Sequence, residues 1–290
     1  MSRRCAFLTT EGLDGPVVDD DLAYAPLQAR GWEVEAVPWR STEARWAAFD
    51  AVVIRSAWDF QDDPHGFVEA LARIAASGAR LANPLPMVRW NLRKTYLFDL
   101  DCWGVRTVPT VWRPGFLDGD LDHLYRDLNT QELVVKPVVG ANGRGALRVA
   151  AGDVGARDEA ERAFHGREAI VQPFQPSVLR EGEVSLFFLD RAFSHAVRKV
   201  PARGEFRSQE EHGGRVSSFQ PEAALVKSAG QMIDRLEAPP LYARVDVVRD
   251  RSGAWAVMEL ELVEPSLYLR MDSGAPERFA EALERWVGRD

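Results

Sequence analysis

The sequence predicts an α/β protein, and three patterns along its 290 residues support this class. Short apolar runs alternate with amphipathic segments toward the N-terminus, as in a parallel sheet covered by helices. Longer strand-like runs and a hairpin pattern occupy the C-terminal third. The proline-rich segment ANPLP, residues 82–86, is predicted to be a linker. We therefore expect an N-terminal parallel α/β domain followed by lobes that mix helices and strands.

The elements of the first unit follow from the spacing of its apolar residues. Strands are predicted at 5–10, 32–39 and 51–56, and helices at 17–30 and 65–76. The segment TTEGLDG follows the first strand, where a dinucleotide-binding fold has its glycine-rich fingerprint. The first unit is therefore predicted to be an α/β domain without that cofactor signature.

The rest of the chain opens with a predicted helix over 91–104, with Asn91 as its N-cap and Gly104 as its stop. Residues 105–174 mix short strands and helices. The remaining elements are predicted as strands at 183–190 and 192–200, a glycine-rich loop at 201–214, a helix at 222–237, a hairpin at 241–264 and a helix at 275–288.

Composition and charge favour an ordinary globular protein of the cytoplasm. The two cysteines, Cys5 and Cys102, have no metal-binding or redox spacing, so both are expected to be buried, reduced thiols. No segment approaches the roughly 18 consecutive apolar residues of a membrane span. The net charge is −8 and no basic stripe is present, which argues against a nucleic-acid partner. Neither a membrane nor a nucleic acid is expected as a partner.

A candidate phosphate loop lies in the segment LVVKPVVGANGRGALRV, residues 133–149. Lys136 on a predicted strand precedes Gly140, Gly143 and Gly145, and a second strand follows. Glycines allow backbone N–H groups to approach phosphate oxygens, and lysine adds a positive charge. The order differs from a P-loop and fits a hairpin that folds over a nucleotide. The alternative is an ordinary glycine-rich turn with a salt-bridged lysine.

A candidate metal site lies in the C-terminal hairpin. Glu259 and Glu261 share one face of a strand because side chains alternate, and the DRSG turn places Asp246 opposite residues 257–259. Three converging carboxylates repel one another unless a cation compensates them. Oxygen ligands without histidine or cysteine favour Mg²⁺ over zinc. The alternative is a solvated sheet face, although the apolar residues between the acids argue against an open strand.

A candidate substrate site lies at the end of a predicted parallel strand, where open α/β sheets bind ligands. In the segment RSAWDF, Arg55 could bind a carboxylate, and Ser56, Trp58 and Asp59 could contact an amino group or an apolar portion. Arg270, after the hairpin, is a second candidate for a substrate carboxylate. The alternative is a turn that caps a helix and packs in the core.

From about Asn83 to Arg270, the order of these motifs resembles the ATP-grasp superfamily, in its glutathione-synthetase-like branch of ATP-dependent carboxylate–amine ligases. The resemblance implies an ATP-grasp fold, in which an N-terminal domain is followed by two lobes that clamp ATP. It implies an N-terminal domain over 1–88, a central lobe over 89–171 and a C-terminal lobe with the magnesium site over 172–290.

The resemblance also implies roles for individual residues. "NLRKTYLF", "VVKP" and "GANGRG" resemble the two phosphate-binding lysine segments and the flap, and "AIVQPFQPS" resembles the hinge that lines adenine. Lys199 stands where the family has an arginine, and the third magnesium ligand, here Glu261, is often asparagine. The implied set is Lys94, Lys136, Gly140, Gly143, Gly145, Gln172, Pro173, Phe174 and Glu183 for ATP, Lys199 and Arg207 for catalysis, and Asp246, Glu259 and Glu261 for magnesium.

The segment ELELVEPSLYL, residues 259–269, further resembles a sub-branch that includes the ligase closing the ring of D-cycloserine. The implied activity is phosphorylation of a small-molecule carboxylate by ATP, followed by attack of an amine to form an amide or a ring. The implied cofactors are ATP and two Mg²⁺ ions, with Mn²⁺ as a substitute, and a homo-oligomer is the implied assembly. A phosphotransferase and a non-catalytic nucleotide-binding module are the alternatives, and the retained acids and lysines disfavour the second of these.

Overall fold

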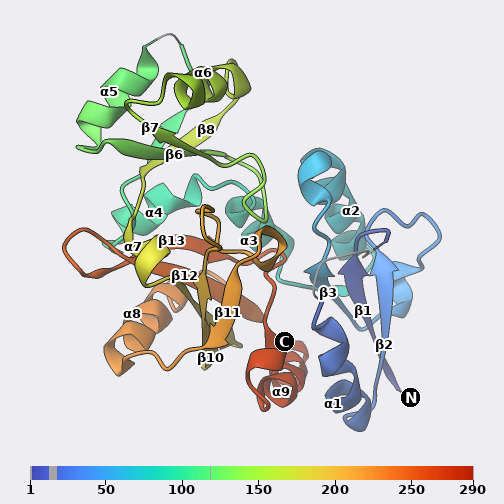
Figure 1. Cartoon of the computed structure of the whole chain (residues 1–290). Helices are drawn as coiled ribbons and strands as arrows, with labels where there is room; N and C mark the ends of the chain where they lie inside the picture. The colour runs from blue at the N-terminus through green and yellow to red at the C-terminus, as the bar shows by residue number, and fades with distance from the viewer. Residues whose placement is uncertain (1, 13–17, 118, 290) are drawn as a thin grey trace.

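In the computed structural model, which describes residues 2–12, 18–117 and 119–289, the chain forms three sheets (Figure 1). A parallel sheet has the order β2-β1-β3-β4, and an antiparallel sheet has the order β5-β8-β6-β7. A five-stranded antiparallel sheet has the order β11-β10-β9-β12-β13. The predicted α/β class is confirmed. Within the described residues, no helix is long and apolar enough to cross a membrane.

The parallel sheet contains the three strands predicted for the first unit and one short strand in addition. Its strands are β1 (Arg3–Thr9), β2 (Trp32–Pro38), β3 (Ala51–Ser56) and β4 (Arg80–Ala82). The helix predicted over 17–30 is instead a 3₁₀ turn, η1 (Asp20–Ala23), followed by α1 (Tyr24–Ala29), and residue 17 lies outside the described residues. Cys5 is buried in β1 as predicted, whereas Cys102 is exposed, so that prediction was wrong.

Helix α2 (Pro64–Ala76) confirms the amphipathic segment predicted at 65–76. Its start is determined locally, because the Asp63 carboxylate accepts a hydrogen bond from the Gly66 N–H at 2.9 Å and proline occupies the first turn. Its buried face, which includes Phe67, Leu71 and Ile74, packs against the sheet.

The helix predicted over 91–104 is divided in two, and Asn91 is not an N-cap. Helix α3 (Leu85–Asn91) ends at Asn91, and α4 (Tyr96–Cys102) begins after a short turn. The Asn91 side chain instead bonds the Leu260 carbonyl at 2.8 Å and the Leu262 N–H at 2.7 Å. Sequence periodicity could not reveal this role, because the partners lie about half the chain away.

The segment predicted as a linker, 82–86, is fixed to the rest of the protein by buried hydrogen bonds of Asn83. Asn83 is fully buried, and its amide donates to the Tyr242 and Leu262 carbonyls at 3.0 and 2.8 Å. Its side-chain oxygen accepts from the Leu241 N–H at 2.6 Å. Asn83 therefore joins the first unit to the five-stranded sheet instead of marking an exposed connection.

The antiparallel four-stranded sheet and two helices form a central lobe with its own core, seen at the top of Figure 1. Phe116, Leu124, Leu133, Val149 and Phe164 belong to this core. The lobe comprises β5 (Val111–Arg113), α5 (Asp120–Asp127), β6 (Glu132–Pro137), β7 (Leu147–Ala150), α6 (Val154–Ala163) and β8 (Ala169–Pro173).

The C-terminal part is built on the five-stranded sheet, and its long strands, hairpin and helices follow the prediction closely. The edge strand β11 was not predicted. The elements are α7 (Ser177–Arg180), β9 (Glu183–Leu189), β10 (Ala192–Val200), η4 (Glu210–His212), β11 (Arg215–Ser218), α8 (Ala223–Ile233), β12 (Tyr242–Arg249), β13 (Trp255–Glu261), η5 (Leu269–Met271) and α9 (Ala275–Val287).

Two short 3₁₀ turns, η2 (Trp46–Ala48) and η3 (Phe60–Asp62), belong to the first unit.

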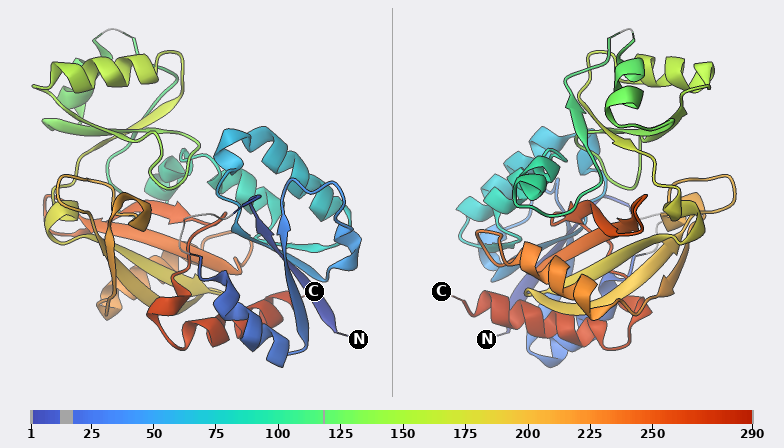
Figure 2. Two further views of the ribbon diagram at one scale, coloured as in Figure 1. Left: turned by 45° about the vertical axis from the view of Figure 1, so that its right-hand side comes forward. Right: turned by 90° about the vertical axis from the view of Figure 1, so that its left-hand side faces the viewer.

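Two features differ from the expected domain boundaries. The α4 residues Tyr96, Leu97 and Leu100 belong to the core of the five-stranded sheet, although the expectation placed 89–171 in the central lobe. The last helix, α9, shares a core with the parallel sheet, and its Phe279 ring lies 5.9 Å from the Phe7 ring in an edge-on contact. Figure 2 shows α9 beside α1. The first unit and the C-terminal part therefore form one base, on which the central lobe stands.

Polar contacts connect the central lobe to this base on two sides. At the hairpin turn, Arg251 donates to the Asn129 carbonyl at 2.5 Å and to the Thr130 hydroxyl at 2.7 Å. On the opposite side, Arg144 forms an ion pair with Asp62 at 2.7 Å. Such contacts are weak compared with a shared apolar core. Apolar contact adds to them, because Ile170 on β8 of the lobe belongs to the core of the five-stranded sheet.

We predict that Asn83→Ala lowers the free energy of unfolding by about 3 kcal/mol, because three buried backbone groups lose their partner. Urea denaturation measures this change. Gln131→Ala removes an exposed amide and should cost about 0.5 kcal/mol or less. Equal losses in the two variants would show that the Asn83 bonds do not stabilise the fold.

Candidate active site

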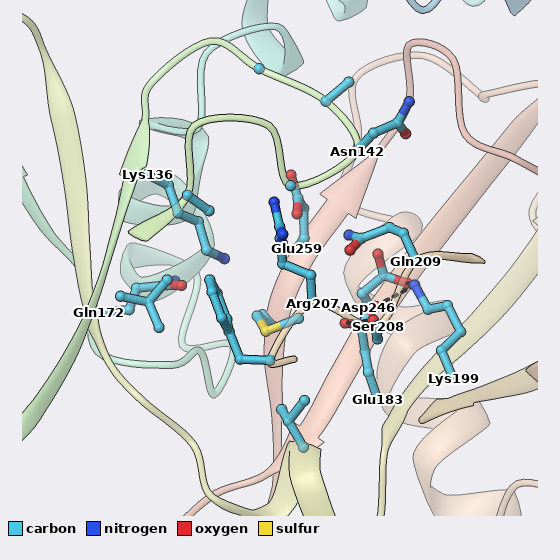
Figure 3. Close-up of a pocket in the computed structure, with 18 of the residues that line it drawn as sticks. Lys136, Asn142, Gln172, Glu183, Lys199, Arg207, Ser208, Gln209, Asp246 and Glu259 are labelled. Carbon is cyan, nitrogen blue, oxygen red and sulfur yellow. Dashed lines mark hydrogen bonds and ion pairs between the residues drawn. The ribbon is translucent and has the colours of Figure 1, made fainter. Parts of the chain in front are cut away.

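A concave site lies between the central lobe and the five-stranded sheet. Figure 3 shows Lys136 and Gln172 on one side of it and Asp246, Glu183 and Lys199 on the other. One end is polar and holds most of the residues that the sequence singled out. The other end is apolar and is lined by Val108, Val134, Phe174, Val178 and Met258.

The hairpin register brings the three predicted carboxylates together. Asp246 on β12 pairs with Glu259 on β13, as the turn predicted, and a bulge after Asp246 leaves Met258 without a pairing partner. One carboxylate oxygen from each of Asp246, Glu259 and Glu261 lies within 4.8 Å of the others. The predicted convergence is confirmed, and the set fits a divalent cation that prefers oxygen ligands.

Asp246 is the most constrained member of this carboxylate cluster. It is 2% exposed, accepts a bond from the Ser185 hydroxyl and lies 3.5 Å from the Lys199 ammonium. The Arg244 guanidinium contacts it at 3.0 Å. Burial alone would raise the pKa of Asp246, but Arg244 and then Lys199 lower it to about 2. Asp246 is therefore ionised throughout the physiological range.

Glu259 links the carboxylate cluster to the flap. Its carboxylate lies 2.6 Å from the Lys94 ammonium, which also donates to the Gly140 carbonyl at 2.7 Å. Burial would lower the pKa of Lys94, but Glu259 raises it above its ordinary value. Burial likewise favours a protonated Glu259, yet Lys94 and then Lys136 keep its pKa below the ordinary range. The pair is therefore charged on both sides.

Lys136 lines the pocket, and no acidic group of the described chain lies within salt-bridge distance of its ammonium. Burial lowers the pKa of Lys136 below its ordinary value, and the charge of Glu259 offsets this only in part. The alternative of a salt-bridged structural lysine is therefore not supported. Lys136 remains available for an anionic ligand such as a phosphate.

Glu261 and Glu264 favour protonation. Burial raises the pKa of Glu261 to about 7, although Arg244 opposes this rise and forms an ion pair with it. Burial and then the charge of Glu261 raise the pKa of Glu264 to about 8. One member of the cluster, Glu261, and its neighbour Glu264 thus have raised pKa values in the absence of a further cation.

Lys199 is almost completely buried, at 1% exposed, and forms an ion pair with Glu183 as well as Asp246. Although burial favours its neutral form, Asp246 and then Glu183 raise the pKa of Lys199. Glu183 also accepts a bond from the Ser208 hydroxyl at 2.9 Å. Glu183, which the resemblance assigned to ATP binding, is therefore paired with Lys199 and connects β9 and β10 with the loop that follows.

The predicted flap is a hairpin between β6 and β7, and two of its glycines, Gly140 and Gly143, line the pocket, whereas Gly145 does not. Gly143 requires its small size, because its φ is +65° and an added Cβ would lie 3.1 Å from the Arg207 side chain. The Asn142 carbonyl lies 3.1 Å from the His212 ring nitrogen. The flap therefore contacts the 201–214 loop over the pocket mouth.

Arg207 lies in the pocket lining under this flap, but it is paired within its own loop. Its guanidinium contacts Glu205 at 2.6 Å. Hydrogen bonding to Arg207 lowers the pKa of Glu205 to about 2. Glu205 engages the Nε and Nη2 groups of Arg207, so Nη1 is the part of the guanidinium that is left for a ligand.

The predicted hinge residues lie on and just after β8. Gln172, Pro173 and Phe174 all line the pocket, beside its apolar end. The Gln172 amide donates to the Thr110 hydroxyl at 2.9 Å, so this side chain supports the connection between the lobes. The flat apolar surface next to it suits a nucleotide base.

The proposed substrate residues lie elsewhere. Within the described chain, Arg55, Ser56, Trp58, Asp59 and Arg270 are absent from the pocket lining. Arg55 is buried and bonds Asp20 at 2.8 Å, and Arg270 pairs with Asp19 at 2.8 Å.

The other members of this set also have structural contacts. The Trp58 indole donates to the Glu264 carbonyl at 3.2 Å, and Asp59 accepts from the Trp39 indole at 2.6 Å. Ser56 is buried without a hydrogen-bond partner among the described residues. These contacts correspond to the alternative of a core-packing turn, and substrate binding at this segment stays a prediction.

Sequence reasoning missed Arg244. It lies directly opposite Glu261 in the hairpin and bonds both Glu261 and Asp246. The signal was available, because residues two apart share a strand face and Arg244 precedes Asp246 by two. Ser185 was also missed, and nothing local to its strand indicates that it faces Asp246 from β9.

We predict that the melting temperature of the metal-free protein falls as pH rises from 5 to 8. Glu261 and Glu264 have pKa values of about 7 and 8 in the folded protein, against an ordinary value of 4.5. The folded state therefore binds these protons more tightly than the unfolded chain does. The resulting stabilisation is complete below pH 4.5 and is lost as pH rises through the folded-state pKa values. Glu264→Gln cannot ionise and should flatten this decline. An equally steep decline in Glu264→Gln and in the unmodified protein would contradict the assignment.

Comparison with known proteins agrees with this geometry. Residues 5–83 match the family described as "D-cycloserine synthetase DcsG, N-terminal domain", and residues 119–260 match "Prokaryotic glutathione synthetase, ATP-grasp domain". The chain is 34% identical to the cycloserine biosynthesis protein DcsG of Streptomyces lavendulae, over 95% of this chain and 96% of that protein. It is 23% identical to a glutathione synthetase of Prochlorococcus marinus, over 77% and 75% of the two chains.

The crystal structure of D-cycloserine synthetase DcsG superposes with a TM-score of 0.85 and 28% identity, covering 98% of this chain and 99% of that one. The D-alanine–D-alanine ligase from Bacillus anthracis shares the fold, with a TM-score of 0.71, 14% identity and coverage of 99% and 98%. ATP-grasp ligases use ATP and Mg²⁺. With one third of its residues identical to DcsG along nearly its whole length, the chain belongs to the ATP-grasp family and is an ATP-dependent carboxylate–amine ligase.

Proposed function

We propose that this ligase closes a ring within one substrate molecule, as in the formation of D-cycloserine. The observation that carries the proposal is the match of residues 5–83 to the N-terminal domain of D-cycloserine synthetase. None of the described residues of this unit lines the pocket, so its similarity bears on the substrate more than on ATP. The identity to DcsG along the rest of the chain supports the same substrate class.

D-Cycloserine is a cyclic hydroxamate, in which the carboxyl carbon of a serine skeleton is bonded to nitrogen on its side-chain oxygen. The proposed substrate is therefore a D-serine derivative that carries nitrogen on that oxygen. Its carboxylate oxygen attacks the γ-phosphorus of ATP, and ADP leaves. The nitrogen then attacks the acyl carbon, phosphate leaves with the bonding electrons, and a proton is lost from nitrogen.

The residues of the polar end are suited to the first step. We propose that Lys94, Lys136 and Lys199 oppose the charge of the phosphates, with Lys136 the cation least engaged by protein groups. Asp246, Glu259 and Glu261 would hold Mg²⁺, because their oxygens lie within 4.8 Å of one another. Bound there, the metal would supply charge neutralisation for the phosphate oxygens.

Two arginines are proposed to act on the transferred phosphate and the acyl oxygen. Arg244 already contacts Asp246 and Glu261, so its guanidinium lies beside the proposed metal ligands. Arg207 lies under the flap and is proposed to stabilise the acyl-phosphate or the oxyanion. The flap and the 201–214 loop would exclude water, which otherwise hydrolyses the acyl-phosphate.

Roles for the apolar end of the pocket and for the flap are proposed from the residues that line the pocket or belong to the flap. We propose that Gln172, Pro173 and Phe174 line the adenine, partly through backbone groups, and that Gly140, Gly143 and Gly145 cover the phosphates. Glu183 is proposed to position Lys199. A role for Arg55, Ser56, Trp58, Asp59 and Arg270 in substrate binding is retained as a proposal that requires Arg55 and Arg270 to exchange partners.

The number and kind of metal ions, the assembly and the location of the protein are proposed as well. Two Mg²⁺ ions and their replacement by Mn²⁺ are in keeping with a cluster of hard oxygen ligands. Assembly into a homo-oligomer follows from the family resemblance. A cytoplasmic location fits two free thiols, Cys5 and Cys102.

The activity is tested with ATP, Mg²⁺ and D-serine derivatives that carry nitrogen on the side-chain oxygen. We expect one ADP per ring formed and a product with the mass and retention of authentic D-cycloserine. A product joining two substrate molecules would instead indicate intermolecular ligation. A stable phosphorylated product would indicate a phosphotransferase, and either result would refute ring closure.

We predict that Glu259→Gln loses at least about 100-fold in kcat, because the phosphate charge is no longer neutralised, while its melting temperature stays close to that of the unmodified protein. ADP release and thermal unfolding are the measurements. Glu222→Gln is the matched control, because Glu222 pairs with Arg249 on the surface, 3.0 Å apart. Near-native turnover of Glu259→Gln would exclude the proposed metal site.

A further inference from the structure

Tyr268, in the loop after β13, has an unusual backbone conformation. Its φ and ψ are +48° and +43°, in the left-handed region that bulky side chains rarely adopt. Such a conformation costs free energy and persists only where the surroundings determine it. The protein therefore maintains this residue in one position at some cost to stability.

Several groups fix that position. The ring nitrogen of buried His195 lies 2.9 Å from the Leu267 carbonyl, and the His195 ring stacks on Phe187 with centroids 4.4 Å apart. The Phe187 ring lies 6.1 Å from the Tyr268 ring, and the Arg270 guanidinium lies 5.1 Å from it on another side. Tyr268 is consequently only 6% exposed.

The hydroxyl group of Tyr268 is distinct from those of the other well-buried tyrosines. Tyr242 donates to the Ile54 carbonyl at 2.7 Å, Tyr125 donates to the Val149 carbonyl at 3.1 Å, and Tyr96 accepts from the Leu260 N–H at 2.9 Å. Among the described residues, the Tyr268 hydroxyl makes no such hydrogen bond, and its oxygen is not one of the fully enclosed polar atoms, because Tyr268 lines the pocket. Buried tyrosine hydroxyls usually have a partner, so this one is left for a ligand in the pocket.

Tyr268 lines the same pocket as the carboxylate cluster. Its neighbours there include Lys199 and Arg244, and the Arg244 guanidinium bonds the Ser266 carbonyl at 3.4 Å, in the same loop. Burial raises the pKa of the Tyr268 phenol above its ordinary value, although Lys199 and Arg244 lower it in part. The group therefore keeps its proton at neutral pH and can act as a hydrogen-bond donor.

We propose that the Tyr268 hydroxyl donates a hydrogen bond to the carboxyl-derived oxygen of the substrate and so selects and orients the carboxylate that is activated. The inference rests on the proposed ligase reaction and adds a substrate contact to it. The two cations beside Tyr268 favour an oxygen that carries negative charge, and that charge increases when nitrogen attacks the acyl carbon. The phenol proton stays on Tyr268 throughout.

The test compares Tyr268→Phe with Tyr242→Phe. Each removes one hydroxyl oxygen from a buried ring, but only Tyr242 uses that oxygen within the protein. Tyr268→Phe should lower kcat/KM for the D-serine derivative by about 100-fold, leave KM for Mg-ATP within about twofold, and leave the melting temperature unchanged. Tyr242→Phe should lower the melting temperature and preserve kcat/KM for that substrate.

The unmodified enzyme is assayed first, so that failure to form D-cycloserine counts against the proposed function and not against Tyr268. If another carboxylate is turned over, the same comparison is made with that carboxylate. The inference is overturned if Tyr268→Phe keeps kcat/KM within about threefold of the unmodified enzyme. It is also overturned if KM for Mg-ATP rises in proportion, or if the melting temperature falls as far as in Tyr242→Phe.

Discussion

The register of the β12–β13 hairpin is the constraint on which the site depends. It places Asp246 opposite Glu259 and Arg244 opposite Glu261, so acids and a cation share one buried strand face. Like charges at this distance are costly in a low dielectric unless opposite charges accompany them. Lys94, Lys199 and Arg244 supply those charges from three different segments. The site is thus a charge-balanced network before any ligand enters.

The same network joins parts of the chain that have separate cores. Lys94 lies between α3 and α4, on the base, and bonds both Glu259 and the Gly140 carbonyl of the flap. One lysine side chain therefore contacts both the carboxylate cluster and the flap. Apolar packing joins the two parts as well, because Ile170 on β8 belongs to the core of the five-stranded sheet.

The sequence was most informative where function depends on alternation within one strand or hairpin. The positions of Glu259, Glu261 and Asp246 followed from strand parity and turn length, and the structure confirms that they converge. The same alternation of side chains places Arg244 on this strand face, although it was overlooked in the sequence. The glycine spacing predicted the flap for a similar reason, because the chemistry and the backbone requirement lie in the same few residues.

The sequence was least informative where a side chain has a distant partner. Arg55 looked available for a ligand, but Asp20 neutralises it, and no local pattern reveals a pairing across 35 residues. Asn91 looked like a helix start because its partners, near residue 260, could not be seen from helix periodicity. The placement of α4 on the five-stranded sheet likewise depends on long-range packing.

The position of α9 has a consequence for synthesis of the protein on the ribosome. Phe7 and Trp32 of the first sheet share a core with Phe279 and Trp286, which are translated last. Until residues 275–287 leave the exit tunnel, this face of the N-terminal sheet is covered only in part, by Ala23 and Leu27 of η1 and α1. The first unit therefore cannot complete its fold ahead of the rest, whereas the central lobe, whose core is formed between residues 116 and 171, can do so earlier.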